Sequence, residues 1–501
     1  MKYLLDHKQM QQCDINTMEY FGVISPVLME RAALCLTEEI LKVMPKDGKP
    51  VLIVCGTGNN GGDGLAAARM LFQHDVPVDI WYPGNEEKAS AEGKRQLEIV
   101  RKYAIPVYNE APHKEYSCIV DCLFGIGLSR DVGGIYYDVI DQMNAMSGIK
   151  VAADIPSGIH TDSGQIMGIA FRADMTVTFG FRKLGHVLFP GADYCGNIIL
   201  REMGIDRYSL LDITPQAFHL EENDLCQVVK RPRQSNKGTY GKLLLIAGAR
   251  NMAGAAVLAA KGAYAAGVGL VRVVTPECNR EIIQKLVPEA VLTTYEENTE
   301  DVSFLPEAFD WADAIAAGPG LGQSETSGLI LKAVLGVKDK KVLLDADALN
   351  LVAGQNGQTA LPKQCVITPH LGEMQRLCGL PVKDQQKDLI KVALDFAKGY
   401  NTCVVLKDAH TVICGPDGDV CINLTGNPGM AVGGSGDVLS GVIGCLLASG
   451  SDVFPAGCMG AYIHGRAGDL AAEKNGMAGM SASDLVPEVK EVMRLAEMRG
   501  E

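Results

Sequence analysis

Short apolar runs recur along the chain, and most are followed by a loop rich in glycine or in polar side chains. Val51–Cys55 and Lys242–Ala247 carry four or five consecutive apolar residues, which is typical of parallel strands covered on both faces. Stretches with helical spacing, such as Ala91–Tyr103, lie between such runs. This alternation predicts an α/β fold with loops gathered at one edge of each sheet.

The expected elements form two series. In the first, the pattern predicts helices within residues 11–44, at 65–73 and at 91–103, and strands at 51–55, 78–82, 117–121, 150–153 and 175–179. In the second, it predicts strands at 242–247, 270–275, 313–317, 341–344, 366–367 and 403–406, and a buried helix at 438–448. The segment Asp206–Asn223 is of mixed polarity and contains Thr214-Pro215, so we expect an interdomain linker there. We therefore expect two three-layer sandwich domains, 1–215 and 216–501, of which the first is Rossmann-like.

Charge and composition narrow the class of partner. A net charge of −14 over 501 residues argues against nucleic acid or an anionic membrane as a main partner, but a small anionic ligand needs only a local patch. The apolar run Ala253–Val274 is long enough to suggest a membrane span. Lys261, Arg272 and several glycines interrupt it, so a helix, a turn and a strand are expected instead.

Cysteine usage indicates a reducing compartment. The chain has 15 cysteines, an odd number, and they are scattered without a CxxC pair. Several, such as Cys55, Cys118 and Cys403, lie inside apolar runs, so we interpret them as reduced core thiols. The first residues lack a long apolar region and hence an apparent secretory signal, which favours a cytoplasmic protein.

The strongest chemical signal is the stretch Gly426–Asp437. Five glycines crowd these twelve residues, which end in a lone carboxylate and run into the buried helix expected from Val438. A glycine-rich turn before a helix aims unpaired N–H groups at one point, which attracts phosphate. Asp437 beside such an anion site is placed to take a proton from a hydroxyl group while a phosphoryl group is held. The alternative is a simple turn in which Asp437 only caps the helix.

A second glycine-rich loop, Gly56–Gly64, follows the strand Val51–Cys55 and precedes a helix. Strand, glycine turn and helix form the dinucleotide-binding layout, although the spacing is not GxGxxG. A tight turn stabilised by asparagine side chains is the alternative. It would not require two adjacent asparagines, four glycines and an aspartate together.

Four predicted strands of the first half end in polar side chains. The residues are Asn59, Asn60 and Asp63, then Asp121, then Asp154 and Ser157, and finally Lys183. Each alone fits a cap or a turn. Because ligands bind at the carboxyl ends of parallel strands, their convergence predicts a binding site. Asn60, Asp121 and Ser157 offer hard oxygen ligands with one formal charge, which suits a monovalent or weakly held cation better than zinc.

Two residues in the second half invite more than one interpretation. His370 with Glu373 suggests a metal site, but a third ligand at matching spacing is missing, so ligand binding or a role at the start of a helix is favoured. Lys407 follows a predicted strand and suits contact with a phosphate group. A solvated lysine is the alternative.

Motifs in both halves resemble one enzyme family. The first half is similar to the NAD(P)H-hydrate epimerase domain of the YjeF N-terminal type, through GNNGGDG (58–64), VDCLFGIG (120–127), DIPSG (154–158) and the segment Phe179–Lys183. The second half resembles the NAD(P)H-hydrate dehydratase domain, which is ribokinase-like. That resemblance rests on Gly254-Ala255, GPGLG (318–322), LLDADALN (343–350), TPHLGE (368–373), LKDAHT (406–411) and GNPGMAVGGSGD (426–437). The fused order resembles the bifunctional bacterial and archaeal repair enzymes.

For the first half, the resemblance implies epimerisation of the R and S forms of NADHX and NADPHX, with Asp154 and Lys183 as catalytic residues. The residues implied to bind the hydrate are Asn59, Asn60, Gly61, Gly62, Asp63, Gly125, Ile126, Gly127, Leu128, Ser129, Arg130, Asp131 and Asp154. Asn60, Asp121 and Ser157 are implied to hold potassium.

For the second half, the resemblance implies dehydration of the S-hydrate with Asp437 as the catalytic carboxylate. Ala255, Gly320, His370 and Asp437 would bind the hydrate, and Lys407, Asp408, Ala409, His410, Thr411 and Gly436 would bind adenine nucleotide, with Mg²⁺ as cofactor. The fused layout favours ADP, giving AMP and phosphate, by resemblance only. The residues themselves leave open ADP or ATP as donor and NADHX or NADPHX as preferred substrate. We also expect a homo-oligomer.

Two other functions remain to be weighed. A kinase for a small alcohol would share the GxGD pattern around Asp437 but leaves the N-terminal half without a role. The second alternative is a scaffold protein whose first half binds a nucleotide without converting it. The presence of Asp121, Asp154 and Lys183 favours an enzyme.

Overall fold

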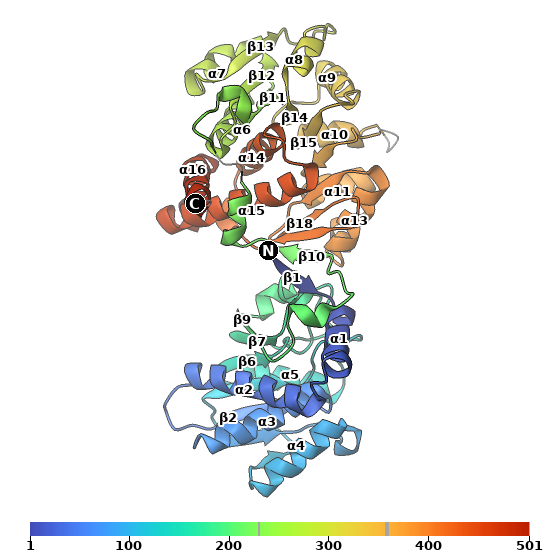
Figure 1. Cartoon of the computed structure of the whole chain (residues 1–501), viewed down its shortest axis with the longest axis vertical. Helices are drawn as coiled ribbons and strands as arrows, with labels where there is room; N and C mark the ends of the chain where they lie inside the picture. Colours follow the sequence, from blue (N-terminus) through green and yellow to red (C-terminus); the bar gives the residue numbers. More distant parts are fainter. Residues whose placement is uncertain (229–230, 356–359, 500–501) are drawn as a thin grey trace. The chain divides into compact units, whose positions relative to one another are not determined.

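The structure, a computed structural model, describes residues 1–228, 231–355 and 360–499. Contacts divide the chain into two compact units, of which one is Tyr3–Pro215. The other begins at Gln216 and includes Met1–Lys2. Both are α/β sandwiches with helices on the two faces of a mostly parallel sheet, as the sequence predicts (Figure 1).

The N-terminal unit is built on a parallel sheet with the strand order β4-β3-β2-β5-β6-β7-β9. Its strands are β1 (Lys2–Leu5), β2 (Val51–Cys55), β3 (Val78–Trp81), β4 (Val107–Tyr108), β5 (Cys118–Cys122), β6 (Ile149–Ala153), β7 (Met175–Phe179), β8 (Arg182–Lys183) and β9 (Asn197–Arg201), and β1 pairs with β8. Its longer helices are α1 (His7–Ile15), α2 (Ser25–Val43), α3 (Asn59–Gln73), α4 (Ala91–Lys102) and α5 (Ile135–Ala145), and a π-helical turn, Asn16–Tyr20, follows α1. Short 3₁₀ turns lie at Glu86–Lys88, Leu184–His186, Gly191–Tyr194 and Arg207–Leu210.

Alternating side chains of β2 explain the layers of this unit. Val51 and Ile53 pack in one apolar cluster with residues of α2 and α3, whereas Leu52 and Val54 pack in another with residues of α5. Every residue of β2 is buried, which accounts for its unbroken apolar run. The chain winds from β2 outward to β4 and then from β5 outward in the other direction, so the carboxyl ends of β2 and β5 form a topological switch point.

The C-terminal unit has the strand order β13-β12-β11-β14-β15-β16-β17-β18-β19-β10. Its strands are β10 (Ala217–His219), β11 (Lys242–Ile246), β12 (Leu270–Pro276), β13 (Val291–Tyr295), β14 (Ala314–Ala317), β15 (Lys341–Leu344), β16 (Cys365–Ile367), β17 (Cys403–Leu406), β18 (Thr411–Cys414) and β19 (Val420–Asn423). β18 runs antiparallel to both its neighbours. β10 lies inside the segment expected as a linker and pairs with β19, so that segment is partly built into this sheet.

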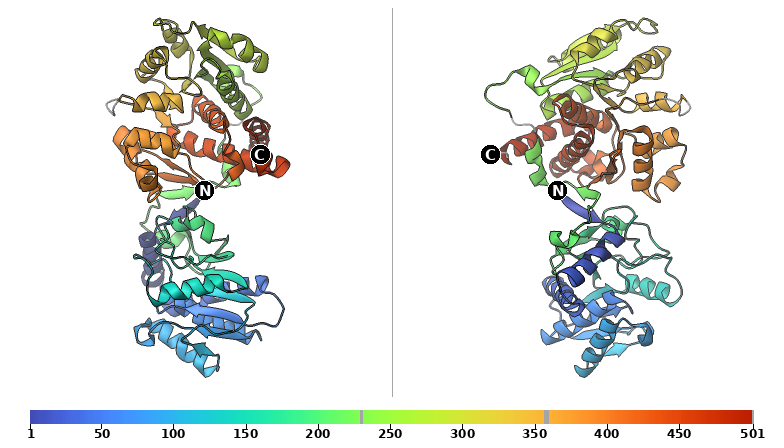
Figure 2. Two further views of the ribbon diagram at one scale, coloured as in Figure 1. Left: turned by 180° about the vertical axis from the view of Figure 1, so that it is seen from behind. Right: turned by 45° about the vertical axis from the view of Figure 1, so that its right-hand side comes forward.

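Helices cover both faces of the C-terminal sheet (Figures 1 and 2). They are α6 (Ala253–Ala266), α7 (Arg280–Leu286), α8 (Leu305–Trp311), α9 (Glu325–Leu335), α10 (Asp347–Ala353), α11 (Leu371–Cys378), α12 (Val382–Gln385), α13 (Leu389–Tyr400), α14 (Ser435–Ala448), α15 (Val453–Asn475) and α16 (Ala482–Arg499). Short 3₁₀ turns lie at Glu222–Gln227, Lys237–Tyr240, Glu277–Asn279, Pro428–Met430 and Met477–Gly479. The apolar run from Ala253 is a helix, a turn at Gly267 and a strand, as predicted. Within the described segments, no helix has both the length and the apolar character needed to cross a bilayer.

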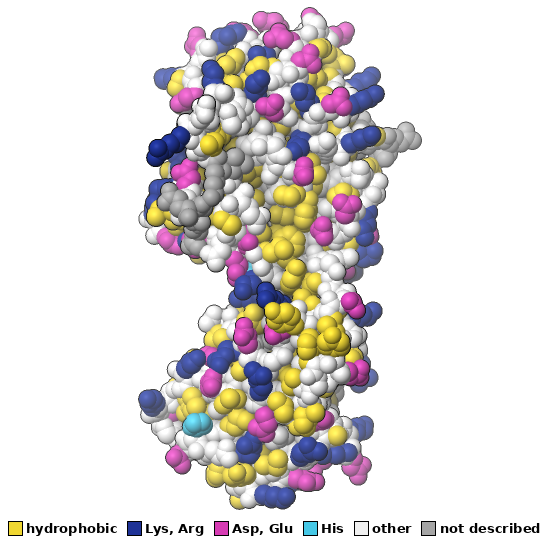
Figure 3. Space-filling model, in the orientation of Figure 1, with side chains coloured by type: hydrophobic (Ala, Val, Ile, Leu, Met, Phe, Trp, Pro, Cys, Tyr) yellow, Lys and Arg dark blue, Asp and Glu magenta, His cyan; other side chains and the backbone are white. Residues whose placement is uncertain are grey.

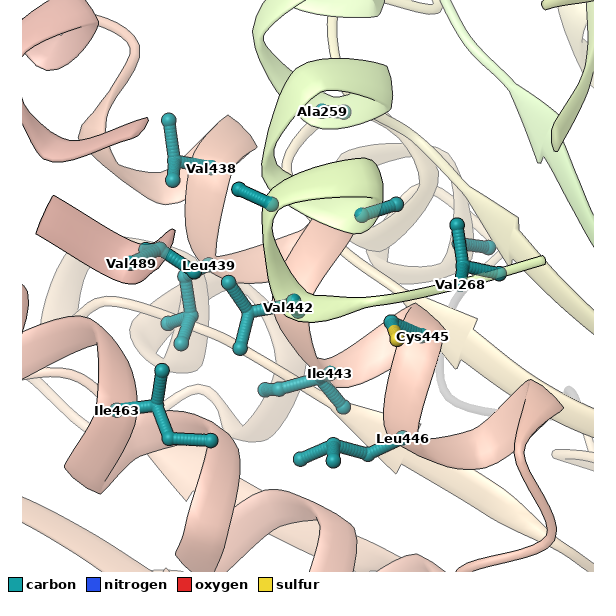
Figure 4. Close-up of a cluster of buried hydrophobic side chains, with 14 of the residues drawn as sticks. Ala259, Val268, Val438, Leu439, Val442, Ile443, Cys445, Leu446, Ile463 and Val489 are labelled. Carbon is teal, nitrogen blue, oxygen red and sulfur yellow. The ribbon is translucent and has the colours of Figure 1, made fainter. Parts of the chain in front are cut away.

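The predicted buried helix is α14, which begins three residues earlier than expected, at Ser435. It is apolar on all sides because it packs between α6, α15 and α16 (Figure 4). A side-chain carbon at Gly441 would collide with the carbonyl of Ala259 in α6, so the small residues of α14 permit close helix packing. This packing holds the glycine-rich start of α14 in place.

The surface carries charges of both signs, and basic and acidic side chains are intermingled on the visible face of each unit (Figure 3). All fifteen cysteines are free thiols. Twelve are buried, and the exposed three are Cys226, Cys278 and Cys378. The interpretation of the cysteines as core thiols therefore holds for most of them.

Candidate active sites

The first site begins at the amino end of α3. The helix starts at Asn59, six residues before the predicted start at Leu65, and its N-cap residue, Gly58, offers no side-chain cap. Glycines make this tight turn possible, because a side-chain carbon at Gly61 would overlap the carbonyl of Gly56. The first N–H groups of α3 therefore lack side-chain partners and can bind an anionic group.

A cavity of about 560 Å³ opens at this point. Most residues predicted to bind the hydrate line it, namely Asn59, Asn60, Asp63, Gly125, Ile126, Gly127, Leu128, Ser129, Arg130 and Asp154, and so does the predicted catalytic Lys183. Three others do not. Gly61 and Gly62 are buried behind the wall in the first turn of α3, and Asp131 is exposed beyond the end of the loop.

Asp154 and Lys183 are in contact in the cavity wall. Asp154 follows β6 with a left-handed backbone, φ 65°, which favours glycine and marks a constrained position. The buried Lys183 Nζ forms an ion pair with Asp154 Oδ1 and donates to Thr178 Oγ1 at 2.8 Å. His186 accepts from the Lys183 backbone N–H at Nδ1, 3.0 Å, and donates from Nε2 to the Asp154 carbonyl, 2.8 Å. Burial, followed by the Lys183 charge, lowers the pKa of His186 to about 3, so the ring is neutral and clamps both backbones.

The three predicted cation ligands lie together beside this cavity. Ser157 Oγ donates to Asp121 Oδ1 at 2.7 Å, and the Ser157 N–H donates to Asp121 Oδ2 at 2.7 Å. Asn60 Nδ2 donates to the Phe124 carbonyl at 3.0 Å. The Asn60 Oδ1 atom is buried and has no hydrogen-bond partner in the described part of the chain. An unpaired buried oxygen is costly unless something binds it, so this oxygen-rich set fits a monovalent cation.

Asp121 supplies the charge of that set. Burial raises its pKa to about 6, against the lowering effect of hydrogen bonds from Ser157 and Leu123. A bound cation would offset the cost of burying its carboxylate. Among the described residues, histidine, cysteine and carboxylate side chains nowhere gather in threes that could hold a metal ion.

The second site lies at the carboxyl ends of β14 to β17. Gly320, in the loop after β14, has φ 55°, and a side-chain carbon there would come within 2.9 Å of the Ala255 Cβ atom. Ala255 lies in the first turn of α6. These two predicted hydrate-binding residues are thus brought together by a close approach that glycine permits.

Asp437 lies in the first turn of α14, and Gly434, with φ 95°, is the N-cap residue. The interpretation of Asp437 as a simple cap is therefore wrong. Burial, followed by the charge of Asp345, raises the pKa of Asp437 to about 7, whereas Lys407 opposes this shift. A carboxylate with this pKa is suited to act as a general base near neutral pH.

Lys407 is held by carboxylates. Its Nζ atom lies 3.0 Å from Asp345 Oδ1 and 3.8 Å from Glu373 Oε2. Burial lowers the pKa of Lys407, but Asp345 and Glu373 outweigh burial, and the net shift is upward. Ser440 Oγ of α14 donates to the other Asp345 oxygen at 2.7 Å. Gly436 lies next to the ammonium group, since a carbon added there would be 3.5 Å from Nζ.

His370 is the N-cap residue of α11. Its Nδ1 accepts from the N–H groups of Gly372 and Glu373, and Glu373 Oε2 accepts from the His370 N–H at 2.8 Å. The predicted role at the start of a helix is confirmed. Burial lowers the pKa of His370, which agrees with a neutral ring that accepts at Nδ1, and its Nε2 atom lies 3.5 Å from Glu373 Oε1.

The remaining predicted nucleotide contacts, Asp408, Ala409, His410 and Thr411, form the turn between β17 and β18 and the first residue of β18. The Lys407 N–H donates to the Pro369 carbonyl at 2.8 Å, which fixes this turn beside the start of α11. Three residues of the two sites were missed as site members: Asp345, Asp14 and His186. Asp345 directly follows the strand β15 within LLDADALN and carried a readable strand-end signal, whereas the other two became recognisable only through their contacts.

Comparison with solved structures identifies the fold of the C-terminal unit. A ribokinase-like superfamily protein from Enterococcus faecalis matches with a TM-score of 0.51 and 30% identity, over 56% of this chain and 97% of that one. A structure titled an ADP/ATP-dependent NAD(P)H-hydrate dehydratase from Bacillus subtilis, co-crystallised with ATP and Mg²⁺, aligns with a TM-score of 0.49 and 33% identity, over 56% of this chain and 98% of that one. The match to the Enterococcus faecalis protein identifies the C-terminal unit as a ribokinase-like domain.

The family follows from the whole chain. Residues 243–491 match the family described as NAD(P)H-hydrate dehydratase, and residues 25–185 match the YjeF-related protein N-terminus. A bifunctional NAD(P)H-hydrate repair enzyme from Thermofilum pendens is 36% identical, over 96% of this chain and 94% of that protein. The chain belongs to the family of bifunctional NAD(P)H-hydrate repair enzymes. A match along both units leaves no support for the small-alcohol kinase or the scaffold.

Proposed function

We propose that the C-terminal unit, 216–501, restores NAD(P)H from the S-hydrate by phosphoryl transfer from ADP, with Asp437 as general base. The observation that carries this proposal is the position of the Asp437 carboxylate among the first N–H groups of α14, near Lys407 and Asp345. Asp437 takes the proton of the hydrate hydroxyl, whose oxygen attacks the terminal phosphorus of ADP and releases AMP. Phosphate then leaves with the former hydroxyl oxygen, and the ring double bond of NAD(P)H is restored by loss of a proton.

The chain's own groups each have a part in this step. Lys407 and the N–H groups at the start of α14 stabilise the negative charge of the transferring phosphoryl group. Asp345 orients Lys407 through their 3.0 Å contact. Mg²⁺ is expected to arrive with the nucleotide, because it is bound largely by phosphate oxygens and retained waters.

We infer that the N-terminal unit, 1–215, interconverts the R- and S-hydrates, with Asp154 moving a proton and Lys183 positioning its carboxyl group. The ion pair of these two side chains in the cavity wall supports this role. K⁺ at Asn60, Asp121 and Ser157 would anchor the Phe124 loop, whose following residues line the cavity. A cytoplasmic location and homo-oligomerisation remain predictions.

The test uses a mixture of R- and S-NADHX, incubated with the protein and either ADP or ATP, while the absorbance of NADH is followed. Full recovery of NADH, faster than spontaneous interconversion of the epimers allows, is expected with ADP. Recovery of only the S fraction would contradict the epimerase role. No recovery with either nucleotide would contradict the dehydratase role.

A further inference from the structure

One wall of the first cavity comes from α1, outside the region matched to the family, which begins at residue 25. Met10, Gln11 and Asp14 of α1 line the cavity. Asp14 thereby adds a carboxyl group to a lining that already contains Asp63, Asp154 and Lys183. The proposed chemistry gives Asp14 no role.

Asp14 and Asp154 have different surroundings. Asp154 is paired with Lys183 and accepts from Thr178 Oγ1 at 3.1 Å, so its carboxyl group has two partners in the cavity wall. Asp14 is half-buried, and its carboxyl group forms no hydrogen bond or ion pair with the described residues. It is therefore free to exchange a proton with a ligand in the cavity.

The charges facing Asp14 favour its neutral form. Burial and then the negative charge of Asp154 raise the pKa of Asp14 to about 6, while Lys183 opposes the shift. The charge of Asp14 in turn contributes to raising the pKa of Asp63, after burial and Asp154. The neighbouring Cys13 thiol stays neutral, because burial raises its pKa to about 12. One carboxyl group paired with a buried lysine beside another that is unpaired and has a raised pKa is a usual arrangement of a base and an acid.

We propose that Asp14 is the acid catalyst of epimerisation and that Asp154 is its partner base, an assignment that rests on the epimerase function proposed above. The carbon to be inverted bears the hydroxyl group and is bonded to the ring nitrogen. Asp154 takes the hydroxyl proton, and the oxygen electron pair forms a carbonyl. The carbon–nitrogen bond breaks, its electron pair passes to nitrogen, and nitrogen takes the proton of Asp14.

The open form is an aldehyde tethered to a secondary enamine nitrogen. Rotation about the adjacent carbon–carbon bond presents the other face of the carbonyl group. Ring closure then reverses each transfer: nitrogen attacks the carbonyl carbon, Asp14 recovers its proton from nitrogen, and Asp154 returns its proton to oxygen. The cycle consumes no co-reactant and leaves both carboxyls as they began.

The test is Asp14→Asn in the full-length protein, which removes the transferable proton with little change of shape. R-to-S conversion, measured by chromatographic separation of the epimers and corrected for the spontaneous rate, should fall by roughly 100- to 10,000-fold. Dehydration of S-NADHX by the same sample should remain at the wild-type rate, which shows that the C-terminal unit is folded. Resistance of the buried N-terminal thiols to alkylation, as in the wild type, shows that the unit carrying Asp14 is folded too. Gln12→Ala, at an exposed position of α1 outside the cavity lining, serves as the matched control and should epimerise normally.

The pH profile separates an acid from a structural residue. Because the acid must be protonated, kcat/KM for epimerisation should fall about tenfold per pH unit above pH 6 in the wild type. The residual activity of Asp14→Asn should lack this fall. An unchanged profile in the variant would overturn the proposal, as would conversion within a few-fold of wild type.

Failure of the underlying function has a different signature. If the wild-type protein interconverts the epimers no faster than buffer, the epimerase assignment fails and takes this inference with it. If the wild type is active and Asp14→Asn equally so, only the role of Asp14 is lost. Epimerisation in ¹⁸O-labelled water should leave the hydroxyl oxygen largely unexchanged, because ring opening retains it, and incorporation at every turnover would overturn the ring-opening step.

Discussion

Asp437→Asn distinguishes a catalytic base from a structural carboxylate. If Asp437 takes the hydroxyl proton, its loss should slow dehydration of S-NADHX by roughly 100- to 10,000-fold, which is about 3–5 kcal/mol of barrier. If Asp437 only stabilised the start of α14, asparagine would serve nearly as well. The two interpretations therefore differ by orders of magnitude in rate.

The structure also predicts the sign of a change in stability. A carboxyl whose pKa is raised from 3.8 to about 7 in the folded protein destabilises the fold when it is ionised. The shift corresponds to about 4 kcal/mol at most, and solvent screening at this half-buried position reduces it to roughly 1–2 kcal/mol. Asp437→Asn should therefore be more stable than wild type at pH 8. The difference should shrink as the pH falls from 7 and become small near pH 4, close to the unfolded-state pKa of 3.8.

The assay follows NADH formation from S-NADHX with ADP, alongside denaturant unfolding at pH 8 and pH 4. Wild-type dehydration should fall about tenfold per pH unit below pH 7, because the base becomes protonated. Asp484→Asn, the same change in the first turn of α16, is the matched control and should dehydrate normally. Hydrogen bonds from Ser481 lower the pKa of Asp484, so its carboxylate does not destabilise the fold. The Asp484→Asn protein is therefore not expected to be more stable than wild type. An Asp437→Asn protein that dehydrates within a few-fold of wild type would refute the catalytic role.

Three further predictions follow from the same contacts. Replacing K⁺ with a bulky organic cation should slow epimerisation about 10- to 100-fold while dehydration continues, and Asp121→Ala should abolish that sensitivity; indifference of the wild type to the cation would contradict the site. Lys407→Met removes a charged hydrogen-bond donor worth about 1.5–3 kcal/mol, so KM for ADP should rise about 10- to 150-fold. The low-pH limb of dehydration should also move to higher pH, since Lys407 holds down the pKa of Asp437, and an unmoved limb would count against this contact. Residues 1–215 and 216–501, expressed separately, should each fold and retain one activity. The shorter segment 220–501 should be less stable than 216–501, because it lacks the strand β10 that pairs with β19. Loss of both activities on separation would contradict the division into two units.

Strands and their polar ends were the part of the fold most readable from the sequence. Met175–Phe179 is a strand with the predicted bounds, because a parallel strand buried on both faces requires an unbroken apolar run. The start of α3 was predicted too late because its first turn contains glycines. Glycines lower helix propensity, but in a first turn they are tolerated, because backbone crowding near Gly56 leaves no room for side chains.

Contacts distant in sequence were less readable. Asp345 is hydrogen-bonded to Lys407 and Ser440, and the three residues come from separate parts of the sequence. No local pattern predicts that they are partners. The unpaired oxygen of Asn60 and the position of Asp14 in the cavity wall likewise arise only when remote segments are packed together. Residue type at strand ends could indicate where a functional site lies, but not which side chains form hydrogen bonds or ion pairs with one another.

The buried cysteines of the N-terminal unit allow its unfolding to be followed by thiol alkylation. All six of its thiols, Cys13, Cys35, Cys55, Cys118, Cys122 and Cys195, are buried, whereas the three exposed thiols belong to the C-terminal unit. Alkylating reagents attack thiolates, and burial raises the pKa of Cys118 to about 12, so a closed unit resists them. Mass added to peptides from residues 3–215 would thus time the opening of that unit alone, in an unlabelled protein and without any engineered probe.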